Sequence, residues 1–332
     1  MKRFRLILVC TLLLLGFLYV IGPVPHKPKL GTDLPTLNVP LKEFDHYLAV
    51  REAKLPVKPG NEAIIYWAND SIRGQTDWCL LYLHGFSASR EEGAPTHLNF
   101  ARYFGMNAYL PRLAAHGLDV PEPLLDMYPD SLYATAKEAL VVAHRLGRKV
   151  VIMSTSTGGT LSLKLAADFP QLVDGLILFS PNVQINNGAA FLLSKPWGLQ
   201  LARKVYGGNY RQTNPNLQHQ ECAYWNCIYR LEALVYLQQL VEATMTPTTF
   251  KQVKCPVFLG FYYLDEAHQD DVVKVDAALR MFEQLGTAPA QKRQQAFNAG
   301  VHVIGYGLTS KAQAEVEHAA IEFGEDVLRI EN

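Results

Sequence analysis

The stretch Lys149-Val-Val-Ile-Met-Ser-Thr-Ser-Thr-Gly-Gly-Thr-Leu161 decides how the rest of the chain is interpreted. Residues 150–153 are an uncharged apolar run, which is typical of a strand buried on both faces of a parallel sheet. Small residues follow at once, and a helical pattern of leucines and alanines then continues to Phe169-Pro170. The stretch therefore predicts a buried strand, a very sharp turn with Ser156 at its apex, and a helix.

A serine at the apex of such a turn has a chemical use. The turn lifts the hydroxyl above the carboxyl end of the sheet and points the backbone N–H of Thr157 toward a developing oxyanion. The pattern resembles the nucleophile elbow of the α/β-hydrolases, Gly-x-Ser-x-Gly, with Ser154 in place of the first glycine. Serine and threonine are also ordinary helix N-caps, so a serine-rich cap without chemistry is the alternative.

Strand and helix patterns alternate on both sides of this stretch. Such alternation predicts a doubly wound, mostly parallel sheet that binds ligands at the carboxyl ends of its strands. The resemblance accordingly implies an α/β-hydrolase core at residues 46–181 and 254–332. Strands are expected within residues 57–67, 78–83, 107–113, 173–179, 255–263 and 291–297, and helices at residues 97–104, 131–146, 273–285 and 310–328.

The alternation stops between residues 182 and 253. Helical patterns occur there at residues 189–193, 197–206 and 224–245, and we interpret the segment as a helical cap inserted over the active site. Some of its apolar side chains are candidates for an acyl or alcohol pocket, although packing the cap onto the body is the simpler role for each of them. These candidates are Phe191, Leu192, Trp197, Tyr206, Tyr210, Tyr224 and Trp225.

A second oxyanion donor is expected after the strand at residues 78–83, which ends in His84-Gly85-Phe86-Ser87. In α/β-hydrolases a His-Gly after this strand supplies the N–H of the residue that follows the glycine, here Phe86. The resemblance implies a structural role for His84, and also for His116 in a later loop. A simple turn from strand to loop is the alternative.

The resemblance also implies the chain order Ser, then Asp or Glu, then His. His302 directly follows the last expected strand and is the candidate base. For the acid, counting from the start of the strand at residues 255–263 points to Asp265. Counting back from the next helix instead matches Asp270-Asp-Val-Val273 to the family's Asp-x-Val-Val arrangement. We favour Asp270, because the valines and the helix hold it more rigidly, and we keep Asp265 as the alternative.

Residues 1–22 form a separate segment. Lys2, Arg3 and Arg5 precede an uncharged apolar run at residues 6–21, and no small-x-small cleavage site follows it. This favours an uncleaved signal-anchor whose basic end stays in the cytoplasm. We therefore expect a single-pass protein of the bacterial cell membrane, with the catalytic domain on the extracytoplasmic side after a linker at residues 23–45. Secretion after signal cleavage is the alternative.

Charge and cysteine usage exclude some classes. The 31 basic and 31 acidic residues balance, which gives no electrostatic reason to expect a nucleic acid. No residue spacing suggests a metal site, and no cofactor is expected. Cys222 and Cys227 are close enough to pair in an oxidising compartment. Cys79 and Cys255 fall in or beside expected strands, as buried thiols do.

Together the motifs predict a carboxylic-ester hydrolase similar to the serine-esterase and monoacylglycerol-lipase-like branch. The resemblance implies that Ser156 attacks the carbonyl, His302 takes its proton, and the N–H groups of Phe86 and Thr157 bind the oxyanion. A small ester with an apolar acyl or alcohol part is the expected substrate. Thioesters and amides suit the same triad. A non-catalytic binding protein that keeps the fold is the rival from another class.

Overall fold

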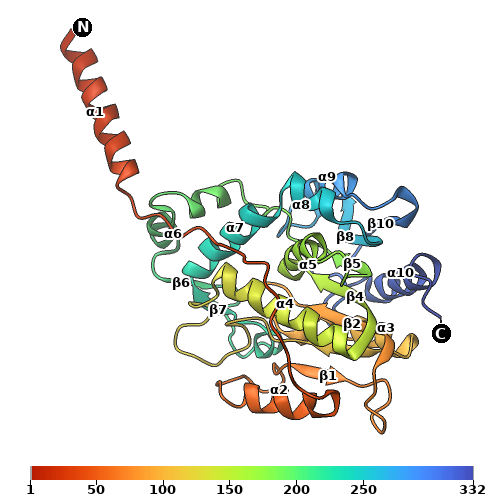
Figure 1. Cartoon of the computed structure of the whole chain (residues 1–332). Helices are drawn as coiled ribbons and strands as arrows, with labels where there is room; N and C mark the ends of the chain where they lie inside the picture. The colour runs from red at the N-terminus through yellow and green to blue at the C-terminus, as the bar shows by residue number, and fades with distance from the viewer. Residues whose placement is uncertain (1, 332) are drawn as a thin grey trace.

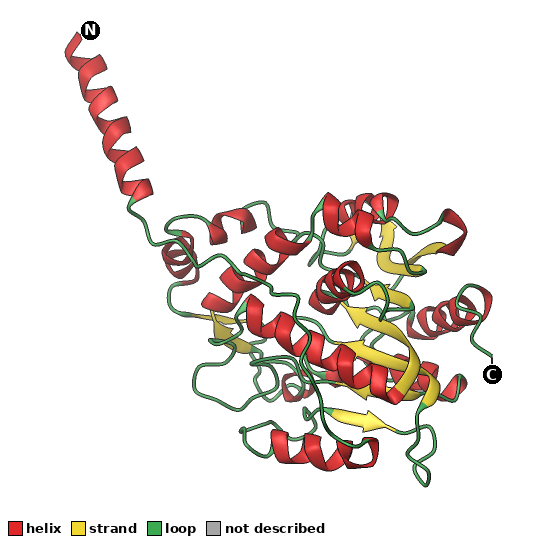
Figure 2. Cartoon of the chain, in the orientation of Figure 1, coloured by secondary structure: helices red, strands yellow, loops and turns green. Residues whose placement is uncertain are grey.

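The computed structural model describes residues 2–331, and a mostly parallel sheet lies at its centre (Figure 2). The strands run in the order β1-β3-β2-β4-β5-β8-β10, and each neighbouring pair is parallel except β1 with β3. The short β9 pairs with β8 alone. This confirms the predicted α/β-hydrolase topology. The strands are β1 (Ile64–Tyr66), β2 (Thr76–Leu83), β3 (Asn107–Leu110), β4 (Gly147–Thr155), β5 (Gly175–Phe179), β8 (Val257–Asp265), β9 (His268–Gln269) and β10 (Lys292–Phe297).

Helices cover both faces of this sheet (Figures 1 and 2). Successive side chains of β4 point to opposite faces of the sheet. Val150 and Ile152 belong to one apolar cluster, and Val151 and Met153 belong to the other. All four are fully buried, which is why a continuous apolar run marks this strand. The first cluster includes side chains of α4 (Pro129–Leu146), α5 (Thr157–Asp168) and α9 (Val275–Gln284), and the second includes side chains of α3 (Thr96–Tyr103) and α10 (Gln313–Asp326).

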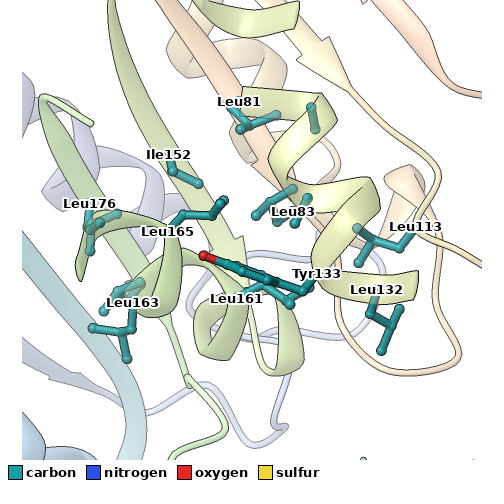
Figure 3. Packing of buried hydrophobic residues seen from close by; sticks show 14 of the residues in the cluster. Leu81, Leu83, Leu113, Leu132, Tyr133, Ile152, Leu161, Leu163, Leu165 and Leu176 are labelled. Carbon is teal, nitrogen blue, oxygen red and sulfur yellow. The ribbon is translucent and has the colours of Figure 1, made fainter. Parts of the chain in front are cut away.

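The apolar layer between the sheet and the pair α4 and α5 fixes the helix that begins after Ser156. Figure 3 shows Tyr133 of α4 lying among leucines of β2 and α5, including Leu83 and Leu161. The Tyr133 hydroxyl donates a hydrogen bond to Asp168 at the end of α5, at 2.5 Å. Burial of these side chains therefore holds α5 in one position relative to the sheet.

The segment between β5 and β8 is only partly helical, and one boundary predicted from the sequence is wrong. A helix was expected at residues 224–245, but α7 begins at Glu232. The preceding residues are taken by a disulfide between Cys222 and Cys227 and by the pairing of β6 with β7. The elements are η3 (Ala190–Ser194), α6 (Gly198–Tyr206), β6 (Tyr210–Gln212), η4 (Gln220–Ala223), β7 (Ile228–Arg230), α7 (Glu232–Thr244) and α8 (Pro247–Gln252).

The amino-terminal helix α1 (Lys2–Val20) projects away from the body (Figure 1) and has no buried residue. By length and composition alone it is able to cross a membrane, a test that a signal sequence also passes. Residues 23–40 are irregular but are bound to the body. The Asp130 carboxylate accepts the N–H groups of Lys29 and Leu30 at 2.9 and 2.8 Å. The chain then enters η1 (Leu41–Glu43) and α2 (Phe44–Glu52).

Candidate active site

Ser156 lies at the turn between β4 and α5 with φ 53° and ψ −117°. Residues with a side chain seldom adopt this conformation, so the surrounding structure must hold it. The Ser156 N–H donates to the Phe179 carbonyl at 3.1 Å, and the Ser156 carbonyl accepts the Asn182 N–H at 2.9 Å. The end of β5 and the residues after it therefore fix the backbone of the turn.

Close packing behind the turn explains the small residues of the motif. A Cβ added to Gly158 would lie 1.9 Å from the Leu83 carbonyl oxygen, and one added to Gly159 would lie 2.6 Å from Cβ of Pro181. Ser154 replaces the first glycine of the motif and is fully buried. Its hydroxyl has no hydrogen-bond partner within residues 2–331. The site accommodates this serine at the cost of an unpaired hydroxyl.

His84 fixes the peptide that carries the Phe86 N–H. Its Nε2 accepts the Leu113 N–H at 3.1 Å, so the ring proton is on Nδ1, which lies 2.9 Å from the Gly85 carbonyl oxygen. Burial lowers the pKa of His84 well below its usual range, so the ring is neutral. In a trans peptide the Gly85 C=O and the Phe86 N–H point in opposite directions. The hydrogen bond from His84 therefore sets the direction of this N–H.

Glu92, in η2 (Arg90–Gly93), holds the same loop from its other side. Its Oε2 accepts the Gly85 N–H at 2.5 Å and the Tyr82 hydroxyl at 3.2 Å, and the residue is 2% exposed. A Cβ added to Gly85 would lie 2.7 Å from Glu92 Oε1 and 3.1 Å from Ser156 Cβ. The carboxyl, the loop and the serine are thus closely packed.

The environment of Glu92 is unusual for a carboxyl group. Burial raises its pKa to about 7, although the Gly85 N–H and the charge of His302 act to lower it. Sequence reasoning missed this residue. Glutamates at two successive positions, Glu91 and Glu92, gave no signal that one is buried beside the candidate base while the other is partly exposed.

His302 and Asp270 form a hydrogen-bonded pair, with Nδ1 and Oδ2 2.6 Å apart. The Asp270 Oδ1 accepts the N–H groups of Val272 and Val273 at 2.9 and 3.1 Å, and the residue is 1% exposed. The backbone of the loop after β8 therefore fixes this carboxylate. Because Nδ1 carries the proton toward Asp270, Nε2 is left free to accept one.

The pair shifts both pKa values. Burial acts to raise the pKa of Asp270, but the charge and hydrogen bond of His302 outweigh it and lower the pKa below its usual range. For His302 burial acts to lower the pKa, whereas the charge and hydrogen bond of Asp270 raise it above 6.5. The carboxylates of Glu92 and Asp271 add to this increase. Each partner thus stabilises the charged form of the other.

Asp265 lies in a different place. It is exposed at the end of β8, where its carboxylate accepts the N–H groups of Ala267 and His268 at 2.9 and 2.8 Å and contacts the His268 ring. The structure therefore brings Asp270, and not Asp265, to His302.

The candidate base and the candidate nucleophile are not hydrogen bonded to each other in this structure. His302 Nε2 is buried and has no hydrogen-bond partner in the part of the chain that is described. Catalytic hydrogen bonds are often long without a substrate. Three loops carry these groups: the loop with Phe86 follows β2, the turn with Ser156 follows β4, and the loop with His302 follows β10. Because these strands are parallel, all three loops lie at the carboxyl-terminal end of the sheet.

Part of the segment between β5 and β8 packs on the Phe86 loop. The Asn226 N–H donates to the Ser87 carbonyl at 2.8 Å, and the ring centroids of Tyr229 and Phe86 are 5.1 Å apart. Trp225 lies against Tyr306, with ring centroids 5.2 Å apart. Two cavities of about 590 and 320 Å³ lie elsewhere, the first beside α2 and β1 and the second between residues 23–27 and α7.

These positions at the strand ends are those at which α/β-hydrolases carry their catalytic groups. The family model described as serine aminopeptidase, S33, matches residues 126–305, which is more than half of the chain. The chain therefore belongs to this family of α/β-hydrolases.

Solved structures share the fold at low sequence identity. The structure of the metagenome-derived lipolytic enzymes LipS and LipT has a TM-score of 0.64 at 17% identity, covering 82% of this chain and 99% of that chain. The Paleococcus ferrophilus monoacylglycerol lipase has a TM-score of 0.58 at 13% identity, covering 81% and 98%. Est1E from Butyrivibrio proteoclasticus, bound to ferulic acid, has a TM-score of 0.55 at 13% identity, covering 82% and 98%. A comparison with curated proteins finds no match.

Proposed function

We propose that this protein is a serine hydrolase that cleaves carboxylic esters through an acyl-enzyme. The observation that carries the proposal is the buried hydrogen bond between Asp270 and His302, at the sheet edge where the strained turn presents Ser156. A hydroxyl needs a base, and the base needs an oriented carboxylate, for nucleophilic catalysis at neutral pH.

The first half of the reaction transfers the acyl group of the ester to Ser156. His302 Nε2 accepts the Ser156 proton while the hydroxyl oxygen bonds to the carbonyl carbon of the ester, and Asp270 stabilises the imidazolium. The carbonyl π electrons move to oxygen, and the N–H groups of Phe86 and Thr157 donate to that oxyanion. When the tetrahedral intermediate collapses, the imidazolium gives its proton to the leaving alcohol oxygen.

The second half releases the acid. His302 takes a proton from water, the hydroxide oxygen adds to the acyl carbon, and the Ser156 oxygen leaves with the proton that His302 returns. The Thr157 N–H is suited to its role because the first N–H groups of a helix have no partner within the helix.

Esters are favoured over thioesters and amides by the similar structures, which include lipolytic enzymes and a monoacylglycerol lipase. The apolar side chains of residues 182–253, which we propose as a cap, suit an apolar acyl or alcohol part. Within this segment Tyr229 packs against Phe86, and Trp225 packs against Tyr306.

We also propose that α1 is an uncleaved signal-anchor and that the hydrolase lies on the extracytoplasmic side of a bacterial cell membrane. The disulfide between Cys222 and Cys227 supports an oxidising compartment. Secretion after cleavage within the amino-terminal segment is the alternative.

A substrate panel tests the chemistry. The purified full chain is assayed on p-nitrophenyl esters of increasing acyl length, on acyl thioesters and on aminoacyl anilides. We expect esters to be turned over at least about 100-fold faster than the anilides, and Ser156→Ala to abolish turnover. Faster cleavage of thioesters or anilides would move the proposal to that substrate class. Ester turnover that persists in Ser156→Ala would contradict the mechanism.

A further inference from the structure

The elements η3 and α6 carry an exposed apolar surface. Leu201 and Val205 are one turn apart on one side of α6, and Trp197 is the N-cap residue of this helix; their exposed fractions are 47%, 72% and 41%. Phe191 of η3, and Tyr206 next to Val205, are also exposed, at 53% and 44%. We call these five residues the α6 face.

The charged residues of α6 itself are basic, and Lys195, just before this helix, forms an ion pair with Glu242. The sequence of α6 contains no acidic residue and has Arg203 and Lys204 in its last turn. Arg203 forms an ion pair with Glu232, whereas Lys204 is exposed. An apolar helix face with aromatic residues and lysines at its margin is typical of a helix that lies in a lipid headgroup layer.

Contacts with the end of α1 fix the position of this face. The Trp197 indole N–H donates to the Leu18 carbonyl at 2.8 Å, and its backbone N–H donates to the Pro23 carbonyl at 3.2 Å. A Cβ added to Gly22 would lie 2.3 Å from the Trp197 indole nitrogen. Helix α6 therefore begins where α1 ends, as Figure 1 shows.

The apolar run of α1 is short relative to a bilayer, which places the end of α1 close to the lipid headgroups. Residues 6–21 carry no charge. The fifteen of these residues that lie in α1 span about 22 Å, whereas a hydrocarbon core is about 30 Å thick. A span this short brings the residues that follow it into the interface. Trp197, bonded to Leu18 inside that run, enters the interface with it.

We propose that the α6 face lies in the headgroup region of the same bilayer that α1 spans. The inference rests on the proposed anchor and does not depend on the proposed ester cleavage. It gives the hydrolase a fixed orientation, with η3 and α6 against the lipid, rather than free rotation on a tether.

A fluorescence measurement on the full chain tests this surface. The chain carries Cys10→Ser and a thiol-linked environment-sensitive dye at Val205→Cys, in phosphatidylcholine vesicles with a nitroxide-labelled lipid. The control places the dye at Ile72→Cys, which is 74% exposed in the loop before β2, at the opposite end of the parallel strands. Burial raises the pKa of the remaining free thiols, Cys79 and Cys255, so they label poorly.

The inference predicts a blue-shifted emission at position 205 and quenching several-fold stronger than at position 72. Leu201→Asp, one turn away on the same face, should weaken the quenching at position 205. Equal quenching at the two positions overturns the inference, and so does recovery of the chain free of vesicles. Because the readout needs no substrate, an inactive but membrane-bound chain refutes only the proposed ester cleavage.

Discussion

At the scale of single residues, two carboxyl groups affect His302 in different ways. Asp270 is hydrogen bonded to the ring, and the charge of His302 holds its pKa below its usual range, so it is charged at neutral pH. Glu92 raises the pKa of His302 through its charge, and its own pKa is about 7. The negative charge beside the candidate base therefore increases as the pH rises through 7.

Asp270→Asn is expected to lower kcat by about 10³ to 10⁴-fold, because the imidazolium loses its orienting carboxylate. The pKa of His302 lies above 6.5 in the native protein, and only its neutral form accepts the Ser156 proton. Without Asp270, burial dominates and lowers that pKa. The acidic limb of the profile of kcat/KM against pH should therefore move to lower pH.

Asp265→Asn is the matched control, since Asp265 bonds to its own turn and not to His302. It should leave both the rate and the profile unchanged. A large loss in this variant, with Asp270→Asn near normal, would reverse the assignment of the acid.

Glu92→Gln is expected to remove a pH dependence of stability. The pKa of Glu92 is raised from 4.5 to about 7 on folding, because burial favours the neutral carboxyl group. The contribution of this group to the free energy of unfolding is therefore fully present below pH 4.5 and is lost as the pH rises through 7. At pH 8 the glutamine variant should be more stable by about 3 kcal/mol, at 1.36 kcal/mol per pKa unit. Urea unfolding at pH 5 and pH 8 measures this.

Glu91→Gln serves as the neighbouring control and should follow the native curve. An identical pH dependence in the Glu91 and Glu92 variants would show that the buried carboxyl does not carry the effect. A functional cost is expected as well: Glu92→Gln should lower kcat above pH 7, because the charge that supports the His302 imidazolium is gone.

The sequence predicted some of these residues and left others open for physical reasons. Ser156 follows a strand that its apolar run marks, whereas the strand before His302 is mostly polar and is predicted only from the alternation of strands and helices. The two counts for the acid disagree because residues 265–269 contain a turn and β9, which pairs back onto β8. Such a hairpin has no strong local signal. Glu92 could not be identified, because nothing in its neighbours distinguishes a buried glutamate from an exposed one.

At the scale of elements, the strand and helix around Ser156 follow from local pattern, whereas residues 224–231 do not. Their apolar residues continue the helical spacing of α7, but Tyr229 is buried in a strand that pairs with β6. A disulfide and a ladder between distant residues override local propensity here. Tertiary pairing of this kind leaves no trace in periodicity.

The double variant Cys222→Ser with Cys227→Ser is expected to lose about 2 kcal/mol of stability, the entropy of closing a short loop. The loop carries Asn226, whose N–H donates to Ser87 beside Phe86. We therefore expect faster amide exchange at Asn226 and a raised KM. Cys10→Ser should change neither. Unchanged exchange at Asn226 would show that the disulfide does not hold this contact.

At the scale of the whole molecule, the parallel sheet gathers loops that lie over 200 residues apart in the chain, from Phe86 to His302. Alternating patterns predicted that arrangement. They did not predict that residues 23–40 are bound to the body. The Lys137 ammonium donates to the carbonyls of Gly31 and Asp33 at 2.5 and 2.6 Å. Backbone acceptors of this kind leave no sequence pattern.

Asp130→Ala is expected to release part of this segment. The carboxylate accepts two backbone N–H groups, from Lys29 and Leu30, and their loss should cost about 1–2 kcal/mol. Hydrogen exchange should quicken at these two amides. Asp126→Ala, an exposed aspartate just before the same helix, should have no such effect. Equal exchange in both variants would mean that other contacts hold the segment.

Labelling with a fluorophosphonate probe, located by mass spectrometry of the full chain, tests the central claim most directly. A serine activated by His302 should react on Ser156 alone, and the adduct should be absent in Ser156→Ala and form far more slowly in His302→Ala. Folded native chain that does not react, or reacts equally in either variant, would contradict the account.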